Sequence, residues 1–344
     1  MSKNFTHRLF VLSLVIVGFC AVALAVAHNA FYGKAIKEPT SIFVNKDTSY
    51  KQLCEIVESA MGNSGAKIQA FKFYAAHISL EKRYKTGHYR LTEDMSVIRI
   101  ARVLALGEQA PVRLVVSEAR TIPHLAAKLS RHLAADSADI VRTLYNKEVR
   151  ASHGFRRDSI IALFIPNTYE VYWAITPEQL LQRMHREYDA FWNEEREAKR
   201  KALKMSRYEV MTLASIVYEE TKATDEMARV AGVYINRLRK GMPLQADPTV
   251  KYALQDFEIK RVLHKHLKFR SPYNTYINRG LPPAPICIPS IAAIDGVLNY
   301  EHHNYIYFCA RPEFDGRHNF ARTLSEHNAN ARAYSAALNK LKIK

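Results

Sequence analysis

The sequence has 344 residues, of which 48% are hydrophobic and 24% are charged, and this is the composition of a globular chain with room for two folded units. Its formal net charge is +17. In a cytosolic protein such a charge favours a nucleic-acid partner, but the N-terminal segment predicts that most of this chain lies outside the cytosol. An exported basic protein meets anionic cell-wall polymer or lipid head groups instead. We therefore expect no nucleic-acid partner.

An apolar segment, residues 9–27, follows a short tail, residues 1–8, that carries Lys3 and Arg8 and no acid. The segment has no charged residue and approaches the ~20 residues that a helix needs to cross a bilayer. Because basic flanking residues stay in the cytoplasm, the sequence predicts a single-pass anchor with the rest of the chain exported. A cleaved signal peptide is the alternative, since residues 25–27 read Ala-Val-Ala, but the segment is longer than the ~7–15 apolar residues of a signal-peptide core.

Three similar units occupy residues 38–135, and each is typical of a short strand, a polar turn and an amphipathic helix. When the units are superposed in sequence, Ser49, Ser96 and Thr121 coincide as N-cap residues of the three helices. The unequal spacings exclude a solenoid, so the pattern predicts a small α+β region. Its size suits a carbohydrate-binding module as well as a structural spacer, and the pattern alone favours the spacer.

The remaining residues, 136–344, are mainly helical in pattern. Two capping boxes, Thr176 with Gln179 and Ser206 with Glu209, predict the starts of two helices.

Three cysteines, Cys54, Cys287 and Cys309, lie outside the apolar segment. A disulfide between Cys287 and Cys309 is compatible with the sequence, and isolated thiols are the default. The sequence leaves the pairing open.

Two adjacent carboxylates, Glu219 and Glu220, end the helix that begins after Ser206. Glu220 falls on the same helical stripe as Leu213 and Val217, whereas Glu219 lies off that stripe. A carboxyl group against an apolar surface loses hydration, so we expect the pKa of Glu220 to be raised. Such a group stays protonated near neutral pH and can give its proton to a leaving oxygen. Spacing alone still favours a structural role in the corner between two helices over a catalytic one.

Four segments in one order carry a resemblance to a known family: LASIVYEET, INRLRKGMPLQADPTVKYAL, SPYNTYINRGLPPAPICIPS and HNFARTLSEHN. Together they closely resemble the MltG/YceG family of endolytic murein transglycosylases, and several motifs in order are stronger evidence than one. The resemblance extends from the anchor to the C-terminus. It implies an α+β protein with an N-terminal transmembrane helix, a LysM-like α+β region at residues 38–135, and a mixed α/β, YceG-like catalytic domain at residues 136–344 with the catalytic Glu on a helix.

In that family the catalytic glutamate directly precedes a small hydroxyl residue at the end of the LASI helix, and here this is Glu220 before Thr221. The chain departs from the family pattern at Tyr218, where members often have Glu, and at Asn167, where they usually have Asp. The matching segments imply a set of substrate-binding residues, for which turn and scaffold roles also stay open: Gln245, Asp247, Thr249, Tyr273, Asn274, Thr275, Glu326, His327 and Asn328.

The implied reaction cleaves the β-1,4 bond between N-acetylmuramic acid (MurNAc) and N-acetylglucosamine (GlcNAc) without water and forms 1,6-anhydro-MurNAc ends. Glu220 would first donate and then accept a proton, so the reaction needs no metal and no cofactor. Two alternatives stay open, a lysozyme-like hydrolase with Asp247 as second carboxylate and a non-catalytic wall-binding scaffold. The 14 histidines show no recognisable ligand spacing, so no metal site is expected.

The sequence therefore predicts an enzyme, a lytic transglycosylase held by one helix in the inner (cytoplasmic) membrane with its catalytic part outside the cytoplasm. The expected substrate is the nascent glycan strand of peptidoglycan. Association with peptidoglycan synthases is implied by the family resemblance alone.

Overall fold

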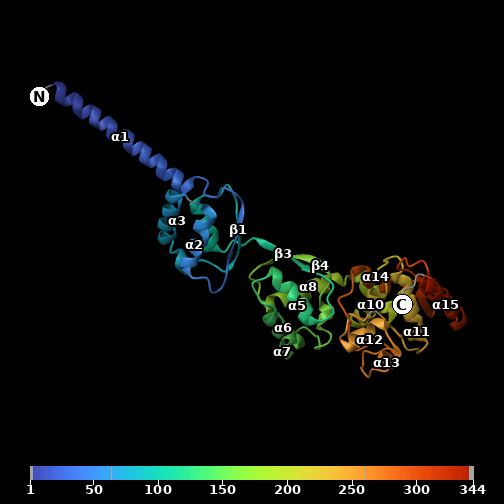
Figure 1. Ribbon diagram of the computed structural model, residues 1–344. Coiled ribbons are helices and arrows are strands. Elements are labelled where there is room, and N and C mark those ends of the chain that lie inside the picture. The colour runs from blue at the N-terminus through green and yellow to red at the C-terminus, as the bar shows by residue number, and fades with distance from the viewer. Residues whose placement is uncertain (1–2, 63, 260, 341–344) are drawn as a thin grey trace. The chain divides into compact units, whose positions relative to one another are not determined.

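The computed structural model describes residues 3–62, 64–259 and 261–340, and within them helices predominate over three two-stranded sheets, a mixed α+β build (Figure 1). The described residues form two compact units. The first contains the residues up to Arg113 together with Glu170–Ile175, and the second contains Leu114–Tyr169 and the residues from Thr176 onward.

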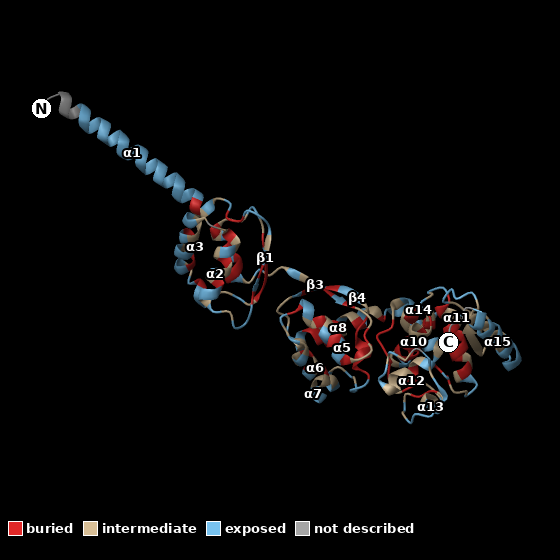
Figure 2. Cartoon of the chain, in the orientation of Figure 1, coloured by how far each residue is buried: buried red, intermediate tan, exposed pale blue. Residues whose placement is uncertain are grey.

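The N-terminal helix α1, Lys3–Tyr32, includes a stretch, His7–Tyr32, that is long and apolar enough to cross a membrane, with a mean hydropathy of 2.9. The helix is exposed along almost all of this stretch (Figure 2). Its C-terminal end packs on the first unit, where the ring of Phe31 lies 6.0 Å from the ring of Phe73. The predicted apolar segment, residues 9–27, lies within α1, and this build agrees with a single-pass membrane anchor.

The first unit is a small α+β assembly built around one antiparallel pair of strands, in which Ile42 lies opposite Tyr89. Its core includes the fully buried side chains of Leu53, Phe71 and Ile100. The elements after α1 are β1 (Thr40–Val44), α2 (Tyr50–Met61), α3 (Gly65–His77), the 3₁₀ helix η1 (Leu80–Lys82), β2 (Gly87–Leu91) and α4 (Val97–Leu106). The predicted pattern of three strand–helix pairs does not include α3.

The three predicted N-cap residues are confirmed. The side chains of Ser49, Ser96 and Thr121 each accept a hydrogen bond from a backbone amide in the first turn of α2, α4 and α5 (Ile122–Leu129) respectively. This bond satisfies one of the amides that the first turn of a helix leaves without a partner, so these short local signals mark helix starts reliably.

The third strand–helix pair does not stay with the first two. Its strand β3, Pro111–Val116, forms a two-stranded sheet with β4, Asn167–Tyr172, and its helix α5 packs against α6, Ser137–Tyr145. The third strand–helix pair thus makes its main contacts with later parts of the chain, although its sequence pattern is similar to that of the first two. The boundary between the compact units falls after Arg113. The extent of the LysM-like region, residues 38–135, stays a prediction.

The second unit is mainly helical, as its pattern predicts. It contains α5, α6 and the parts of β3 and β4 that lie within Leu114–Tyr169, since the unit boundary crosses both strands. Its other elements are η2 (Ser130–His132), α7 (Lys147–Ser152), η3 (Ile160–Leu163), α8 (Pro177–Phe191), α9 (Glu194–Leu203), α10 (Arg207–Glu220), α11 (Met227–Arg239), α12 (Asp247–Leu254), α13 (His264–Leu267), α14 (Ile291–Leu298), β5 (Tyr307–Ala310), β6 (His318–Ala321) and α15 (Leu324–Lys340). Both predicted capping boxes are present, at the starts of α8 and α10.

Helix α10 runs through the core of the second unit, and every residue from Val210 to Val217 is buried. It packs against α11, α12 and α14. Ser215 Oγ accepts a hydrogen bond from the backbone amide of Ile286, which joins the helix to the loop before α14. The helix ends at Glu220 because Thr221 takes an extended conformation, with φ −140° and ψ 140°. A rigid, buried helix therefore presents Glu220 at its C-terminal end.

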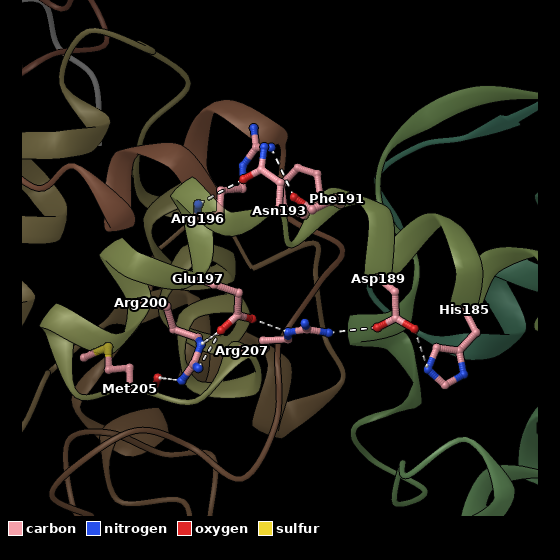
Figure 3. A network of polar contacts seen from close by, with 9 residues as sticks. All are labelled: His185, Asp189, Phe191, Asn193, Arg196, Glu197, Arg200, Met205 and Arg207. Carbon is pink, nitrogen blue, oxygen red and sulfur yellow. Dashed lines mark hydrogen bonds and ion pairs between the residues drawn. The ribbon is translucent and has the colours of Figure 1, made fainter.

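A polar network holds the other end of α10 (Figure 3). Arg207 bonds Asp189 on α8 at 2.8 Å and Glu197 on α9 at 2.5 Å. Glu197 also pairs with Arg200 at 2.6 Å, and Arg200 donates to the backbone oxygen of Met205 at 2.7 Å. Three consecutive helices are tied together at the first residue of α10.

All four cysteines of the sequence carry free thiols, and Cys287 is buried. The disulfide between Cys287 and Cys309 that the sequence left open is absent from the structure.

Candidate functional site

A cleft of about 400 Å³ opens in the second unit at the C-terminal end of α10. The side chains that line it come from α10, α11, the loop before α12 and the first residue of α12, the loop after α13, the β5–β6 hairpin and the start of α15. The lining residues are Glu220, Tyr234, Arg237, Leu244, Gln245, Asp247, Tyr276, Tyr307, Phe308, Cys309, Ala310, His318, Leu324 and His327. Its walls are thus rich in aromatic and hydrogen-bonding groups, which suit a polar ligand with flat apolar faces, such as a sugar.

Glu220 is one of the two carboxyl groups that line this cleft, and the other belongs to Asp247. The carboxyl group of Glu220 is mostly enclosed by protein, and this burial raises the pKa from 4.5 to about 7. The negative charge of Asp247 acts in the same direction, whereas a 2.7 Å hydrogen bond from Tyr234 Oη to Glu220 Oε1 opposes the shift. Near neutral pH the group is therefore poised to give up and take back a proton.

The neighbouring Glu219 lies in different surroundings, as the helical phase predicts. Its carboxylate bonds the guanidinium of Arg120 at 2.8 Å, and it borders a small cavity of about 60 Å³ that also includes Lys251. Lys222 lies 3.9 Å from the same carboxylate. An ion-paired carboxylate away from the main cleft is a poor proton donor, so geometry favours Glu220 over Glu219 as the acid.

Two of the predicted substrate-binding residues, Gln245 and Asp247, line the cleft with Glu220. Gln245 adopts a left-handed backbone conformation with φ 52°, and its Oε1 accepts a hydrogen bond of 3.2 Å from Arg237. Asp247 accepts a hydrogen bond of 2.6 Å from Tyr276 Oη. The turn at Gln245 and the start of α12 thus bring two polar side chains to the cleft that Glu220 lines, and each has a hydrogen-bonding partner that orients it.

Three other predicted residues, Thr249, Asn274 and Thr275, are buried, and the two threonines hold this loop from behind. Thr275 Oγ1 accepts the backbone amide of Ala246 at 3.0 Å and lies 2.8 Å from Thr249 Oγ1. Asn274 Nδ2 donates to the backbone oxygen atoms of two residues earlier in the chain. Their polar atoms are used inside the protein, so the geometry lends no support to direct substrate contact.

Of the next two predicted residues, His327 and Tyr273, only His327 lies in the cleft lining. The ring of His327 stacks on Tyr307 at 5.2 Å. Burial and the charge of Arg237 lower the pKa of His327. Tyr273 packs instead against Tyr252, outside the cleft lining.

Glu326 and Asn328 lie in the first turns of α15. The Glu326 carboxylate accepts backbone amides of Arg322 and Thr323, which caps the helix, and Asn328 is exposed. Neither residue lines the cleft, and their contact with a substrate stays a prediction.

Sequence reasoning missed several lining residues, notably Tyr234, Arg237 and Tyr276. Tyr234 and Arg237 are three residues apart on α11, so helical phase could have placed both on the side of Glu220. Arg237 is 7% exposed and donates to the backbone oxygens of Leu244 and Ile306, which fixes two walls of the cleft.

A polar pair beside the cleft, Glu226 with His318, had no sequence signal, and of the two only His318 lines the cleft. Glu226 Oε2 lies 3.2 Å from His318 Nδ1, and its other oxygen accepts the backbone amide of His318 at 3.2 Å. Both side chains are largely buried, at 5% and 12% exposure. The pair joins the start of α11 to β6 across 92 residues of sequence.

Within the described part of the chain, no group of three or more His, Cys, Asp and Glu side chains is arranged to hold a metal ion.

Fold and site together define a mixed α+β protein in which one enclosed carboxylic acid faces a cleft suited to a glycan. The chain belongs to the YceG-like family, whose model matches residues 42–333.

Proteins of known name support this assignment. A Bacillus subtilis (strain 168) protein named endolytic murein transglycosylase is 26% identical over 342 residues, which cover 92% of each chain. A Streptococcus pneumoniae (serotype 2, strain D39) protein of the same name is 27% identical over 293 residues, and the match covers 76% of this chain and 52% of that protein. A crystal structure of a YceG-like protein from Listeria monocytogenes superposes with a TM-score of 0.56 at 29% identity, covering 85% of this chain and 99% of that one.

Proposed function

We propose that this chain is a membrane-anchored lytic transglycosylase that cleaves MurNAc-β-1,4-GlcNAc bonds within peptidoglycan strands. The observation that carries the proposal is the enclosed Glu220, whose pKa of about 7 lets it act as an acid in a cleft of about 400 Å³. The named relatives from Bacillus and Streptococcus support murein as the substrate class.

In the proposed mechanism Glu220 donates its proton to the glycosidic oxygen while positive charge develops at the muramyl anomeric carbon. The C–O bond to the departing GlcNAc breaks, and Glu220 is left as a carboxylate. The muramyl 6-hydroxyl then attacks the anomeric carbon and gives its proton to Glu220, which closes the 1,6-anhydro ring and restores the acid. The atoms balance without water, so one carboxyl group serves both steps.

Asp247 has a supporting part in this scheme. Its charge raises the pKa of Glu220, and Tyr276 holds its carboxylate by a 2.6 Å hydrogen bond. An oriented negative charge beside the acid also favours the cationic character that develops at the anomeric carbon. In the alternative, a lysozyme-like hydrolase, Asp247 would act directly at the reacting carbon or on water, and the product would be a reducing end.

The setting follows from the same proposal. Helix α1 would hold the enzyme in the inner membrane with both compact units outside the cytoplasm, close to nascent strands. The first unit, with its small α+β build, would serve as a LysM-like module or spacer, and the synthases that make the strands would be its neighbours.

Product analysis of the full chain in detergent tests the proposal, with uncrosslinked glycan strands as substrate and mass spectrometry as readout. We expect 1,6-anhydro-MurNAc ends from the unmodified protein and none from Glu220→Gln. Reducing ends that disappear in Asp247→Asn would establish the hydrolase instead. If the unmodified protein and all the variants bind the strands and none of them cleaves, the protein is a non-catalytic scaffold.

Glu219→Gln is the matched control, because it changes the adjacent carboxyl group in the same way. Glu219 pairs with Arg120 rather than facing the cleft, so anhydro ends should still form. Loss of cleavage in Glu219→Gln together with full activity in Glu220→Gln would reverse the assignment of the acid.

A further inference from the structure

A segment of the second unit, residues 261–279, is basic and apolar at once, and of its residues Tyr276 lines the cleft. We call it the basic–apolar segment. The sequence contains no acidic residue between Glu258 and Asp295. The segment exposes five cationic side chains: Arg261, Lys265, Lys268, Arg270 and Arg279. It also exposes three large apolar side chains, Leu263, Phe269 and Ile277, to 47%, 41% and 50% respectively. Large apolar side chains gathered among cations on a surface indicate a binding face rather than a solvated loop.

The cations of this segment differ from many of the others in the second unit in their ion pairing. Elsewhere in the second unit half-buried arginines and lysines are commonly ion-paired, as in Arg207 with Asp189 and Lys199 with Glu195. Among the described residues none of the five takes part in an ion pair, and Arg279 donates to the backbone oxygen of Gly241. The segment therefore keeps an uncompensated positive charge.

The basic–apolar segment is also held in a defined shape. Asn274 Nδ2 donates to the backbone oxygens of Leu267 and Phe269, each at 2.9 Å. The backbone oxygen of Asn274 accepts the amides of Ile277 and Asn278. The exposed Phe269 and Ile277 are thus tied to one buried residue, two positions before Tyr276 of the cleft.

Charge and apolar exposure together select the partner. A polyanionic glycan would satisfy the cations but would give the exposed Leu263, Phe269 and Ile277 no apolar phase. An anionic bilayer satisfies both, since lipid phosphates pair with lysine and arginine while aromatic and aliphatic side chains enter the boundary of the acyl chains. The same chain carries α1, a helix long and apolar enough to cross a bilayer, and such an anchor would keep the segment near a lipid surface.

We propose that the basic–apolar segment is a second membrane contact, which docks the catalytic unit on the head groups of anionic phospholipids. Because Tyr276 of this segment lines the cleft and gives its backbone amide to Asn274 Oδ1, docking holds the mouth of the cleft close to the membrane surface. The proposal goes beyond the proposed reaction, and its test requires no cleavage.

The test is hydrogen–deuterium exchange of the full chain in nanodiscs, read by mass spectrometry. One nanodisc contains phosphatidylcholine alone, and the other includes roughly 30% phosphatidylglycerol, at moderate ionic strength. We expect the amides of residues 261–272 to exchange at least about fivefold more slowly in the anionic nanodisc than in the neutral one. Peptides from α10 should exchange at the same rate in both.

Three variants separate charge from apolar insertion. Lys265→Glu with Lys268→Glu should abolish the slowing, and Phe269→Ser, which keeps the charge, should reduce it. Arg186→Glu with Lys201→Glu is the matched control, because it removes two exposed cations of α8 and α9 and alters the net charge equally. That control should retain the slowing. Unchanged exchange in α10 shows that each variant is folded.

Equal exchange of residues 261–272 in the two nanodiscs would overturn the proposal. So would slowing in the neutral nanodisc on addition of glycan strands alone, which would make the segment a polymer-binding face. An equal loss of slowing in Lys265→Glu with Lys268→Glu and in its control would show that net charge, rather than this segment, is responsible. Full slowing in both would show that Lys265 and Lys268 have no part in it, and either result would reject docking.

Discussion

Tyr234, in the middle of α11, donates a 2.7 Å hydrogen bond to the carboxyl group of Glu220, the last residue of α10. Burial disfavours the ionised form of Glu220, whereas this bond stabilises it, so the pKa of about 7 reflects both effects. The tyrosine itself is 2% exposed, so its position is set by core packing. Two helices of the core thus determine the protonation of the acid.

Tyr234→Phe should shift the alkaline limb of the pH–rate profile upward by about one pH unit, because a hydrogen bond to a charged group is worth about 1.5 kcal/mol. The substitution keeps the packing and removes only the hydroxyl group. Initial rates of anhydro-end formation across pH would measure the limb. A lower rate with an unmoved limb would show that Tyr234 has only a structural role.

Glu220→Gln should raise the stability of the second unit at alkaline pH. The folded protein keeps the Glu220 proton up to about pH 7, while the unfolded chain loses it near 4.5, so stability falls as pH rises through this window. The glutamine cannot ionise and avoids this loss, which is about 2 kcal/mol for a partly exposed group. Melting curves at about pH 4 and about pH 8 should show a gain of roughly 5 °C only at the higher pH. An equal gain at both values contradicts the raised pKa.

Thr275→Val should lower activity, although Thr275 does not line the cleft. The hydroxyl group accepts the amide of Ala246 and bonds Thr249, so its removal leaves buried polar groups unpaired at a cost of about 1–3 kcal/mol. The loop that carries Gln245 would lose its anchor, and we expect kcat/KM to fall about tenfold. Asn328→Ala, at an exposed position of α15, should leave both stability and kcat/KM unchanged. A fall of kcat/KM in Asn328→Ala, with no change in Thr275→Val, would instead support Asn328 as a substrate contact.

Arg207→Met should destabilise the second unit by about 1–2 kcal/mol, because it strips Asp189 and Glu197 of a shared partner in the network of Figure 3. The chemistry of the products should stay the same, since the change lies at the far end of α10. Thermal melts and product analysis would measure the two effects. Arg142→Gln breaks an ion pair whose side chains are 76% and 47% exposed, so its effect should be close to zero.

Local signals in the sequence predicted local structure well. The capping boxes at Thr176 and Ser206 and the N-caps at Ser49, Ser96 and Thr121 depend on residues within one helical turn, and each is present. The different surroundings of the two adjacent carboxylates also followed from helical phase alone. Such features depend on contacts of three or four residues in sequence, which periodicity encodes directly.

Features that depend on long-range contacts could not be predicted in this way. The SPYNTY segment offers Tyr273, Asn274 and Tyr276, and nothing in its pattern says that Tyr276 lines the cleft while Asn274 is buried behind it. The pair of Glu226 with His318 spans 92 residues and leaves no periodic trace. The division of the chain after Arg113 likewise depends on which helices pack together.

The sequence by itself determined the apolar helix at the N-terminus, the helical frame of the second unit, and the phase that turns Glu220 away from Glu219, because each arises from the chemistry of near neighbours. Tertiary structure alone decided the partners of Glu220. Tyr234, Asp247 and the rest of the cleft meet it only when α10, α11 and the loop before α12 pack, and the enclosure that raises its pKa does not exist before they do.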